Sequence, residues 1–474
     1  MTDLPQIRLH NSLTRRAEVL EPIEAGKVGI YTCGSTVYKY AHIGNLRTYL
    51  FGDLLHRTLE YLGYEVRYVK NITDVGHMRN DEHDAVTGDK VEDAAATEGK
   101  TPEQIADFYT EAWLTDERLL NILPVDVMPK ATEHIPEMID LTERLVERGL
   151  AYEVAGTIYY DVSEFPGYGQ LSGQKVDETH AGHRVDVEHD KRDPADFALW
   201  KRAGEHRRMK WPSPWGDGFP GWHIECSAMS LKHLGERFDV HTGGIDLKFP
   251  HHEDEIAQSE GALGHQVVDV WMHGEFLTMA DAKMAKSADN IIRVADLPDM
   301  GYEPIAFRYL ALTAHYRSKL DFTDAAMHAA ASGLARLRRA VAAGADADAD
   351  GGPLDLSAEP MVAYRRRFTE AIADDLGLPR ALATAHEVAS ASDLADAQRR
   401  ALLLDFDQVL GLSLDAPVAD EAPLPEGAAE LLERRAAARE ARDFATSDAL
   451  RDELAALGVE VRDTPAGQET TVKP

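Results

Sequence analysis

The amino-acid sequence predicts an α/β protein in which a parallel β-sheet domain is interrupted by an insertion and followed by an all-α helical bundle and a small C-terminal module. Strand, helix and strand patterns follow one another over residues 27–72, and a strand pattern returns near residue 239 after a mixed region. Beyond residue 325 the pattern is almost purely helical. A chain of 474 residues is also too long for one ordinary core, so we expect about three or four domains.

The charge balance limits the possible partners. The chain has 50 basic and 82 acidic residues, which gives a net charge of −32 at pH 7. Broad electrostatic binding to nucleic acid draws on lysine and arginine, so an RNA partner must be bound through a shaped, locally positive surface. Arginines cluster within residues 336–339, 365–367 and 434–442. For each cluster alone, a solvated helix face that pairs with nearby acids is the simpler interpretation.

Apolar segments and cysteines indicate the compartment. No stretch approaches the length of uninterrupted apolar residues that spans a bilayer, and residues 1–16 lack the apolar core of a secretory signal. The only two cysteines, Cys33 and Cys226, lie far apart in the sequence. This spacing argues against a disulfide framework and for metal-binding or buried thiols in a reducing compartment. The sequence therefore predicts a cytoplasmic protein with no membrane partner.

The first strand, helix and strand follow from hydrophobic patterning. The pattern predicts a strand over Lys27–Cys33, a helix over Gly44–Leu62 and a second strand over Glu65–Ile72. In a parallel sheet, ligands bind at the carboxyl ends of the strands, where the next helix offers free N–H groups to a phosphate. The run His42-Ile43-Gly44-Asn45 falls at that place. No Gly-x-Gly-x-x-Gly or Walker loop occurs, which argues against ordinary dinucleotide or P-loop chemistry.

Later segments continue this alternation and then change character. The region that ends near Ser213 is rich in Gly, Asp and His and is expected to form an insertion between two halves of the sheet. Two polar segments, Ala342–Pro353 and Leu414–Gly427, are predicted to be linkers. The other predicted elements are helical segments over Pro102–Gly149 and His251–Leu263, strands over Asp239–Leu247 and Gly274–Met279, and helices from about Ala325 onward.

Four residues are candidates for one metal site. His251 and Glu255 are spaced i, i+4, so they project from one face of a helix. The soft thiolates of Cys33 and Cys226 complete a tetrahedral set that is typical of zinc. His252 is a less favoured ligand because the residue four positions later is an isoleucine. For each residue alone, buried structural cysteines and a capped acidic helix start are the alternative. A His-x-x-x-Glu pair also suits hydrolysis by activated water, but two thiolates fit a site for a substrate sulfur better.

A second phosphate motif is the run Lys283-Met284-Ala285-Lys286-Ser287, which follows the predicted strand at Gly274–Met279. Two lysines three residues apart in a mobile loop can close over a triphosphate and neutralise the pyrophosphate as it leaves. A Lys-x-x-Lys alone is common on protein surfaces, but it becomes specific when it follows the His42–Asn45 run. Together with the metal set, these motifs predict an ATP-dependent enzyme that acts on a thiol.

These motifs together resemble the class I aminoacyl-tRNA synthetases, and most closely the cysteinyl-tRNA synthetase family. The resemblance covers nearly the whole chain. The sequence departs from the family pattern at Ser35, where proline is usual, at Ala285, where serine is usual, and at Gln468, where tryptophan often stands. The resemblance rests on the runs Tyr31-Thr32-Cys33-Gly34, His42-Ile43-Gly44-Asn45, Asn71-Ile72-Thr73-Asp74, Gly221-Trp222-His223-Ile224-Glu225-Cys226-Ser227, Phe249-Pro250-His251-His252-Glu253 and Lys283–Ser287.

The resemblance implies a split Rossmann-type catalytic domain with an insertion, followed by an all-α helical bundle and a small anticodon-binding module. The implied domains are the first half of the Rossmann domain at 1–119, a connective insertion at 120–215, the second half at 216–268, a stem-contact region with the lysine loop at 269–327, the helical bundle at 328–411, and the linker with the C-terminal anticodon-binding module at 412–474.

The resemblance also assigns roles to individual residues. The family's zinc ligands fall on Cys33, Cys226, His251 and Glu255, the four residues already chosen. The implied catalytic residues are His42, Asn45, Lys283 and Lys286. The implied ATP contacts are His42, Gly44, Asn45, Asp246, Lys283 and Lys286. The implied contacts to the amino acid are Cys33, Gly34, Thr36, Thr73 and Trp222.

The implied activity is that of a cysteine–tRNA ligase, which activates L-cysteine with ATP and transfers it to the 3′ end of tRNA(Cys). One Zn²⁺ per chain, Mg²⁺ with ATP and a monomeric enzyme are implied. Zinc explains selectivity without editing, because a substrate thiol ionises on the metal whereas the hydroxyl of serine binds more weakly.

Two alternatives remain at this point. One is a ligase of mycothiol biosynthesis that joins cysteine to a glucosaminyl inositol amine, and the other is an inactive paralogue that binds tRNA. The segment Arg434–Gly467 argues against the first, because that ligase lacks an anticodon-binding region. The intact His42, Lys283, Lys286 and metal set argue against the second.

Overall fold

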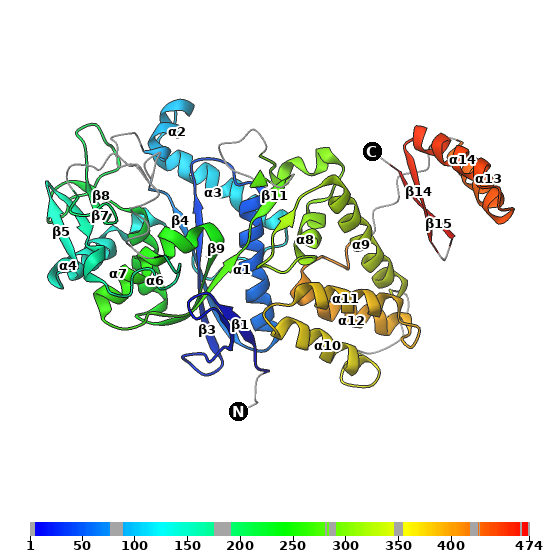
Figure 1. Cartoon of the computed structure of the whole chain (residues 1–474), viewed down its shortest axis with the longest axis horizontal. Helices are drawn as coiled ribbons and strands as arrows, with labels where there is room; N and C mark the ends of the chain where they lie inside the picture. The colour runs from blue at the N-terminus through cyan, green and yellow to red at the C-terminus, as the bar shows by residue number, and fades with distance from the viewer. Residues whose placement is uncertain are drawn as a thin grey trace. The chain divides into compact units, whose positions relative to one another are not determined.

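The chain forms two units, Met1–Asp415 and Ala416–Pro474, in the computed structural model (Figure 1). No helix among the residues that the structure describes is long and apolar enough to cross a membrane. The described residues are 5–75, 89–174, 191–279, 282–283, 291–345, 354–417, 425, 427–464 and 467–472.

A parallel sheet with the strand order β10-β9-β3-β4 forms the centre of the first unit (Figure 1). In its register, Tyr31 of β3 lies opposite His241 of β9, and Thr36 of β3 lies opposite Thr73 of β4. The predicted strand, helix and strand over residues 27–72 are confirmed. The elements are β3 (Lys27–Thr36), α1 (Ile43–Tyr61), β4 (Glu65–Thr73), β9 (Phe238–Gly244) and β10 (Val268–Gly274).

Several elements border the sheet. Asn11 of the N-terminal β1–β2 hairpin donates from Nδ2 to the carbonyl of Asp269 in β10, at 2.9 Å. Helices α6 and α7 carry side chains to the carboxyl-end region of β3. These elements are β1 (Arg8–Asn11), β2 (Arg16–Val19), α6 (Trp222–Leu234) and α7 (Glu253–Leu263), with a π-helical turn at Lys248–His252 immediately before α7.

The predicted continuous strand over Gly274–Met279 is wrong at its start. Gly274 ends β10, and β11 (Leu277–Met279) belongs to a separate sheet with β12 (Ala282–Lys283) and β13 (Leu320–Asp321). The carbonyl groups of the two residues between the strands accept hydrogen bonds from Arg47 of α1. NH1 of Arg47 donates to the Glu275 carbonyl at 2.9 Å and also to the Phe276 carbonyl. This side chain replaces the strand partners at the break.

The segment between β4 and α6 forms a layer of helices and an antiparallel sheet of order β5-β6-β7-β8. The helical pattern over Pro102–Gly149 is interrupted near Asn121, which has a positive φ of 52°. The antiparallel sheet ends at Pro220, directly before α6. The elements are α2 (Lys90–Glu98), α3 (Pro102–Leu119), α4 (Ile135–Glu147), β5 (Ala151–Val154), β6 (Thr157–Tyr160), β7 (Phe197–Arg202) and β8 (Gly218–Pro220).

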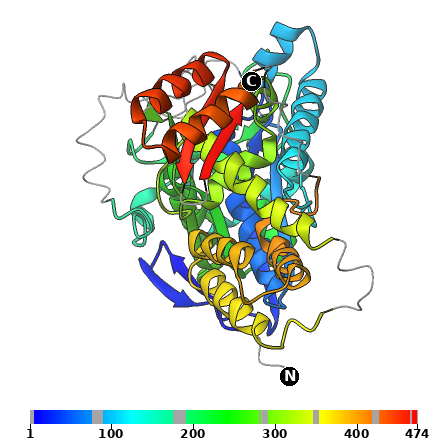
Figure 2. The same ribbon diagram turned by 90° about the vertical axis from the view of Figure 1, so that its right-hand side faces the viewer.

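Helices dominate the rest of the first unit, as the sequence predicts, and those after residue 360 face the viewer in Figure 2 in yellow and orange. Their apolar faces share one core with α1 and the sheet, in which Leu50, Phe307 and Phe406 are among the buried residues. The helices are α8 (Pro304–Leu312), α9 (Asp324–Ala343), α10 (Met361–Ala373), α11 (Leu378–Ser390) and α12 (Asp396–Leu410).

The second unit is a helical pair with a β-hairpin. Arg435 is fully buried there, and its guanidinium group pairs with the carboxylate of Asp463 at 2.9 Å and donates to Oε1 of Gln468 at 3.0 Å. The elements are α13 (Ala428–Glu440), α14 (Phe444–Ala456), β14 (Val459–Thr464) and β15 (Gly467–Val472).

A buried ion cluster joins α1 to the helical bundle. Oδ2 of Asp53 lies 2.7 Å from NH2 of Arg308 and 3.0 Å from Nε of Arg57, and Nε of Arg308 donates to the Leu410 carbonyl at 2.6 Å. Burial alone would raise the pKa of Asp53, but the two guanidinium groups outweigh it and lower the pKa. The negative charge of Asp53 therefore stabilises two buried cations.

We expect Asp53→Ala to lower the free energy of unfolding by about 3–5 kcal/mol, because it removes the carboxylate that pairs directly with both buried guanidinium groups. Urea unfolding measures the loss. Glu111→Ala is the control, because it breaks an exposed pair with Arg118 and should cost under about 1 kcal/mol. The contribution of Asp53 is present above its unfolded pKa of about 4 and is lost as pH falls through the lower folded pKa. Equal losses in both variants would contradict this account.

Candidate metal and nucleotide site

Cys33 is positioned by a β-bulge. Thr32 pairs with Lys70 and Ser35 pairs with Ile72, so β3 has two residues between these pairs where β4 has one. Cys33 and Gly34 together therefore lie opposite Asn71. A bulge of this kind redirects a side chain out of the regular alternation. Only glycine fits at position 34, because an added Cβ would lie 1.6 Å from the Asn71 carbonyl oxygen. The bulge therefore depends on the Cys-Gly pair.

The four predicted metal ligands meet in one buried cluster. Sγ of Cys33 lies 3.7 Å from Sγ of Cys226 on α6 and 3.6 Å from Oε1 of Glu255 on α7. The same Oε1 lies 3.0 Å from Nε2 of His251. The four ligand atoms all lie within 4.8 Å of one another, and all four residues are buried. This donor set of two sulfurs, one imidazole nitrogen and one carboxylate oxygen fits a tetrahedral zinc ion.

The protonation equilibria of this cluster also favour a cation. The hydrogen bond that Cys33 donates lowers the pKa of Cys226 to about 6, while burial raises the pKa of Cys33. Burial alone would lower the pKa of His251, but Glu255 and Cys226 raise it to about 10. Negative charge is therefore concentrated on Glu255 and Cys226, and a divalent cation can replace the protons that these groups share.

A chain of hydrogen bonds that the sequence did not reveal orients His251. Nδ1 of His251 lies 2.7 Å from Nδ1 of His223, and Nε2 of His223 lies 3.2 Å from Oδ2 of Asp254. When Nε2–H of His223 donates to this carboxylate, Nδ1 of His223 accepts from Nδ1–H of His251, so Nε2 of His251 is the nitrogen that a metal would bind in place of a proton. Such carboxylate–histidine contacts behind a ligand fix its tautomer and orientation. The Trp222-His223 and Glu253-Asp254-Glu255 runs contain both residues, but only the fold shows that they touch.

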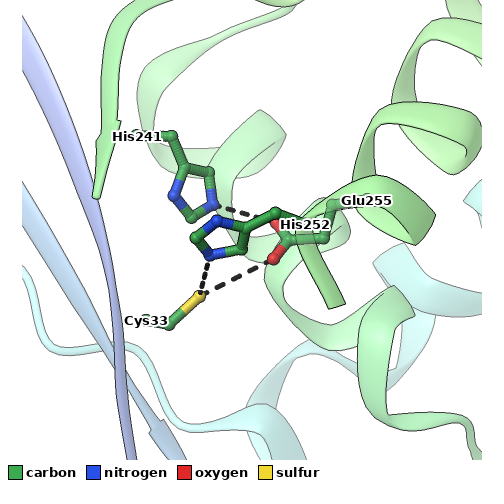
Figure 3. A group of neighbouring side chains, drawn as sticks. All are labelled: Cys33, His241, His252 and Glu255. Carbon is green, nitrogen blue, oxygen red and sulfur yellow. Dashed lines mark hydrogen bonds and ion pairs between the residues drawn. The ribbon is translucent and has the colours of Figure 1, made fainter. Parts of the chain in front are cut away.

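A second donor group shares two of these residues. Cys33, His241, His252 and Glu255 also bring their ligand atoms within 4.8 Å of one another (Figure 3). Nε2 of His252 lies 3.4 Å from Sγ of Cys33, so the spacing argument that disfavoured His252 is incomplete. That argument considered only a partner on the same helix, whereas His252, at the start of α7, approaches Cys33 on β3. His241 was not predicted from the sequence.

Of the residues predicted to contact the amino acid, Trp222 lies against a predicted metal ligand, whereas Gly34 and Thr73 are connected to each other through Asn71. Trp222 lies against His251, with ring centroids 4.5 Å apart. The amide of Gly34 donates to Oδ1 of Asn71 at 2.8 Å, and Nδ2 of Asn71 donates to Oγ1 of Thr73 at 3.1 Å. Asn71 thus connects two predicted contact residues. Thr36 ends β3 opposite Thr73, at the carboxyl edge of the sheet.

The predicted phosphate motif caps α1. The backbone N–H of Asn45 donates to Nδ1 of His42 at 3.2 Å, and the backbone N–H of His42 donates to Oδ1 of Asn45 at 3.3 Å. This capping box fixes the start of a 19-residue helix. A Cβ on Gly44 would lie 2.9 Å from Nδ1 of His42, so glycine leaves room for the imidazole. The two side chains therefore order the helix terminus at which a phosphate would be bound.

The remaining predicted ATP contacts are described only in part. Asp246 is exposed in a short 3₁₀ turn directly after β9, and a Cβ on Gly244 would lie 2.5 Å from its Oδ1. The backbone of Lys283 pairs with Thr278 of β11. The side chain of Lys283 and the whole of Lys286 lie outside the described residues, as do Ala285 and Ser287.

Comparisons with known proteins now identify the family. The profile described as tRNA synthetases class I (C) catalytic domain matches residues 19–332, and that described as Cysteinyl-tRNA ligase anticodon binding domain matches residues 421–470. A cysteine–tRNA ligase of Thermus thermophilus is 44% identical over 474 residues, which cover 97% of this chain and 98% of that protein. The corresponding protein of Chlorobium chlorochromatii is 42% identical and covers 98% and 99% of the two chains. The chain belongs to the cysteine–tRNA ligase family.

The fold of this cysteine–tRNA ligase family member agrees with that assignment. A methionyl-tRNA synthetase of Mycobacterium tuberculosis, solved with methionyl-adenylate, superposes with a TM-score of 0.56 over 89% of this chain and 96% of that chain. Its sequence identity is 18%, so the likeness concerns the fold. The predicted α/β class I synthetase fold is thereby confirmed.

Because the thiol of Cys226 is one of four converging ligand atoms, we expect Cys226→Ser to lose most of the bound metal. The hydroxyl is a harder and far less acidic donor than the thiol. Metal per chain, measured after dialysis against a weak chelator, tests this. Ser227→Ala is the matched control on the same helix, because its hydroxyl donates to Gln258 rather than to the cluster. Equal metal content in both variants would remove Cys226 from the site.

Proposed function

We propose that this chain activates L-cysteine with ATP and transfers the cysteinyl group to the 3′ end of tRNA(Cys). The observation that carries the proposal is the joint match of the catalytic and anticodon-binding profiles, with curated relatives over almost the full length. The buried cluster of two thiols, an imidazole and a carboxylate supports a substrate that contains sulfur. The domain boundaries predicted from the sequence are part of this proposal.

In the first step, the carboxylate of cysteine attacks the α-phosphate of ATP and pyrophosphate leaves. His42 and Asn45 order the N-terminus of α1, where the helix dipole favours negative charge. We assign Lys283 and Lys286 to the charge that develops on the transferring and departing phosphates, with Mg²⁺ bound to ATP. Gly44 gives close access to the helix terminus, and Asp246 is assigned to the ribose or the amino group.

Selectivity for cysteine is assigned to the metal cluster. A zinc ion held by Cys33, Cys226, His251 and Glu255 would supply a Lewis acid that lowers the pKa of a substrate thiol. Trp222, packed against His251, offers an apolar wall for the short side chain of the substrate. Gly34, Thr36 and Thr73 are assigned to the remaining polar contacts with the amino acid.

In the second step, the 2′- or 3′-hydroxyl of the terminal tRNA adenosine takes the aminoacyl group from the adenylate. The match at residues 421–470 supports recognition of the anticodon by the second unit. We also propose a monomeric enzyme that works in the cytoplasm with one zinc ion per chain. The same match disfavours a ligase that joins cysteine to glucosaminyl inositol.

Cysteine-dependent consumption of ATP tests the function directly, with tRNA(Cys) and glucosaminyl inositol as competing acceptors and serine as the control amino acid. We expect cysteine alone to support turnover and tRNA(Cys) alone to accept the product. Transfer to the sugar would establish the other ligase. ATP–pyrophosphate exchange at background level, in protein with a full complement of zinc, would leave only an inactive tRNA-binding paralogue.

If Lys286 neutralises the leaving pyrophosphate, Lys286→Ala should reduce cysteine-dependent ATP–pyrophosphate exchange by about 10²-fold or more. Metal content should stay the same, because this lysine is not in the donor set. Lys319→Ala, which removes an exposed lysine from the same stem-contact region, is the control. An unchanged exchange rate in the Lys286 variant would contradict its proposed role.

A further inference from the structure

The two oxygens of Glu255 have different partners (Figure 3). Oε1 lies 3.0 Å from Nε2 of His251 and 3.6 Å from Sγ of Cys33, so it faces the predicted metal ligands. Oε2 lies 3.0 Å from Nε2 of His241, on the other side of the carboxylate. The carboxylate plane is therefore held between the ligand cluster and one additional imidazole.

His241 is a fixed donor. It lies on β9, is 1% exposed, and stacks on Trp271 with ring centroids 4.5 Å apart and an interplanar angle of 18°. Its Nδ1 has no hydrogen-bond partner among the described residues. An unpaired buried nitrogen usually costs stability, so its retention calls for an explanation. We explain the retention of this histidine by its other ring nitrogen, because Nε2–H donates to Oε2 of Glu255.

We propose that His241 is a positioning residue that holds Oε2 of Glu255, so that Glu255 offers only Oε1 to zinc and the thiol of cysteine can be added as a fifth ligand to the four protein ligands. A carboxylate can bind a metal through one oxygen or both. Occupation of Oε2 by an N–H donor disfavours the second mode. This inference rests on the proposed function, because it concerns how the substrate thiol reaches the metal.

The second donor group in Figure 3 offers a competing role, in which His241 is itself a ligand beside His252. That arrangement would leave Cys226 and His251 outside the metal site, although their ligand atoms converge with Cys33 and Glu255 just as closely. It would also give one thiolate in place of two. The set with both cysteines is softer and suits zinc better, which leaves His241 behind Glu255.

Three variants at position 241 separate these roles. His241→Leu keeps much of the volume and removes the donor. His241→Gln retains an N–H donor at about the reach of Nε2. His241→Asn is polar but too short to reach Oε2, and it replaces the leucine variant if that variant does not fold. His56→Ala is the control, because it removes another buried imidazole that packs on Tyr68 rather than on the cluster.

Each protein is saturated with zinc, and two quantities are measured without ATP: zinc per chain and the dissociation constant for cysteine by equilibrium dialysis. We expect full zinc content in all variants and cysteine binding about 10-fold or more weaker in the leucine variant. The glutamine variant and the His56 control should bind cysteine nearly as the wild type does. In cobalt-substituted protein, the spectral change on adding cysteine should be lost in the leucine variant and restored by glutamine.

The outcomes distinguish this inference from the proposed function. If the zinc-loaded wild type does not bind cysteine, the proposed function fails and this inference fails with it. If the wild type binds cysteine and the leucine variant loses zinc, His241 is a ligand and the positioning role is wrong. If the leucine variant keeps zinc and binds cysteine as tightly as the wild type, the hydrogen bond to Glu255 does not control access of the thiol.

Discussion

Three consecutive carboxylates, at Glu253, Asp254 and Glu255, are buried in the first turn of α7, and much of the surrounding structure depends on the need to balance their charge. Their position at a helix N-terminus is favourable for negative charge, but burial without partners would cost far more. Each of the three carboxylates has different hydrogen-bond or ion-pair partners. Glu253 accepts from two backbone amides, Asp254 accepts from the Tyr168 hydroxyl and lies against an imidazole, and Glu255 lies between two histidines. The histidines around the metal ligands are therefore required by the same charges that make a cation favourable.

The sheet contributes the other half of the site through one local irregularity. Regular pairing of β3 with β4 would keep the strand's side chains in simple alternation, whereas the bulge at Cys33 and Gly34 turns the thiol toward α6 and α7. The amide of Asn71 then accepts from Gly34 and donates to Thr73, so one side chain joins the bulge to the carboxyl end of β4. The bulge that places the predicted metal ligand Cys33 is thereby linked to Thr73, a predicted contact of the amino acid, through the side chain of Asn71.

The sequence predicted the parts of the site that depend on local spacing. His251 and Glu255 were identifiable because four residues separate two ligands on one helix face, and the two cysteines because there are no others. His241 was not identifiable, since its contact with Glu255 is set by the pairing of β9 with β3 and by the approach of α7. His252 was a less favoured ligand because only a partner on its own helix was considered, whereas it approaches Cys33 on β3. Likewise, the break between β10 and β11 depends on a distant arginine that no strand pattern reveals.

The arginine clusters bear on how a chain with a large net negative charge would bind RNA. The structure uses several of these arginines internally: Arg338 pairs with Glu303 and donates to the Leu412 carbonyl, and Arg435 is wholly buried against Asp463. The simpler interpretation is thus correct for these two in the pairing with acids but wrong in the solvated helix face, because both arginines are buried. Arginines held in this way add little long-range attraction, and the net charge of −32 opposes it further. The proposed binding of tRNA would therefore rest on shape and on a few placed contacts rather than on total charge.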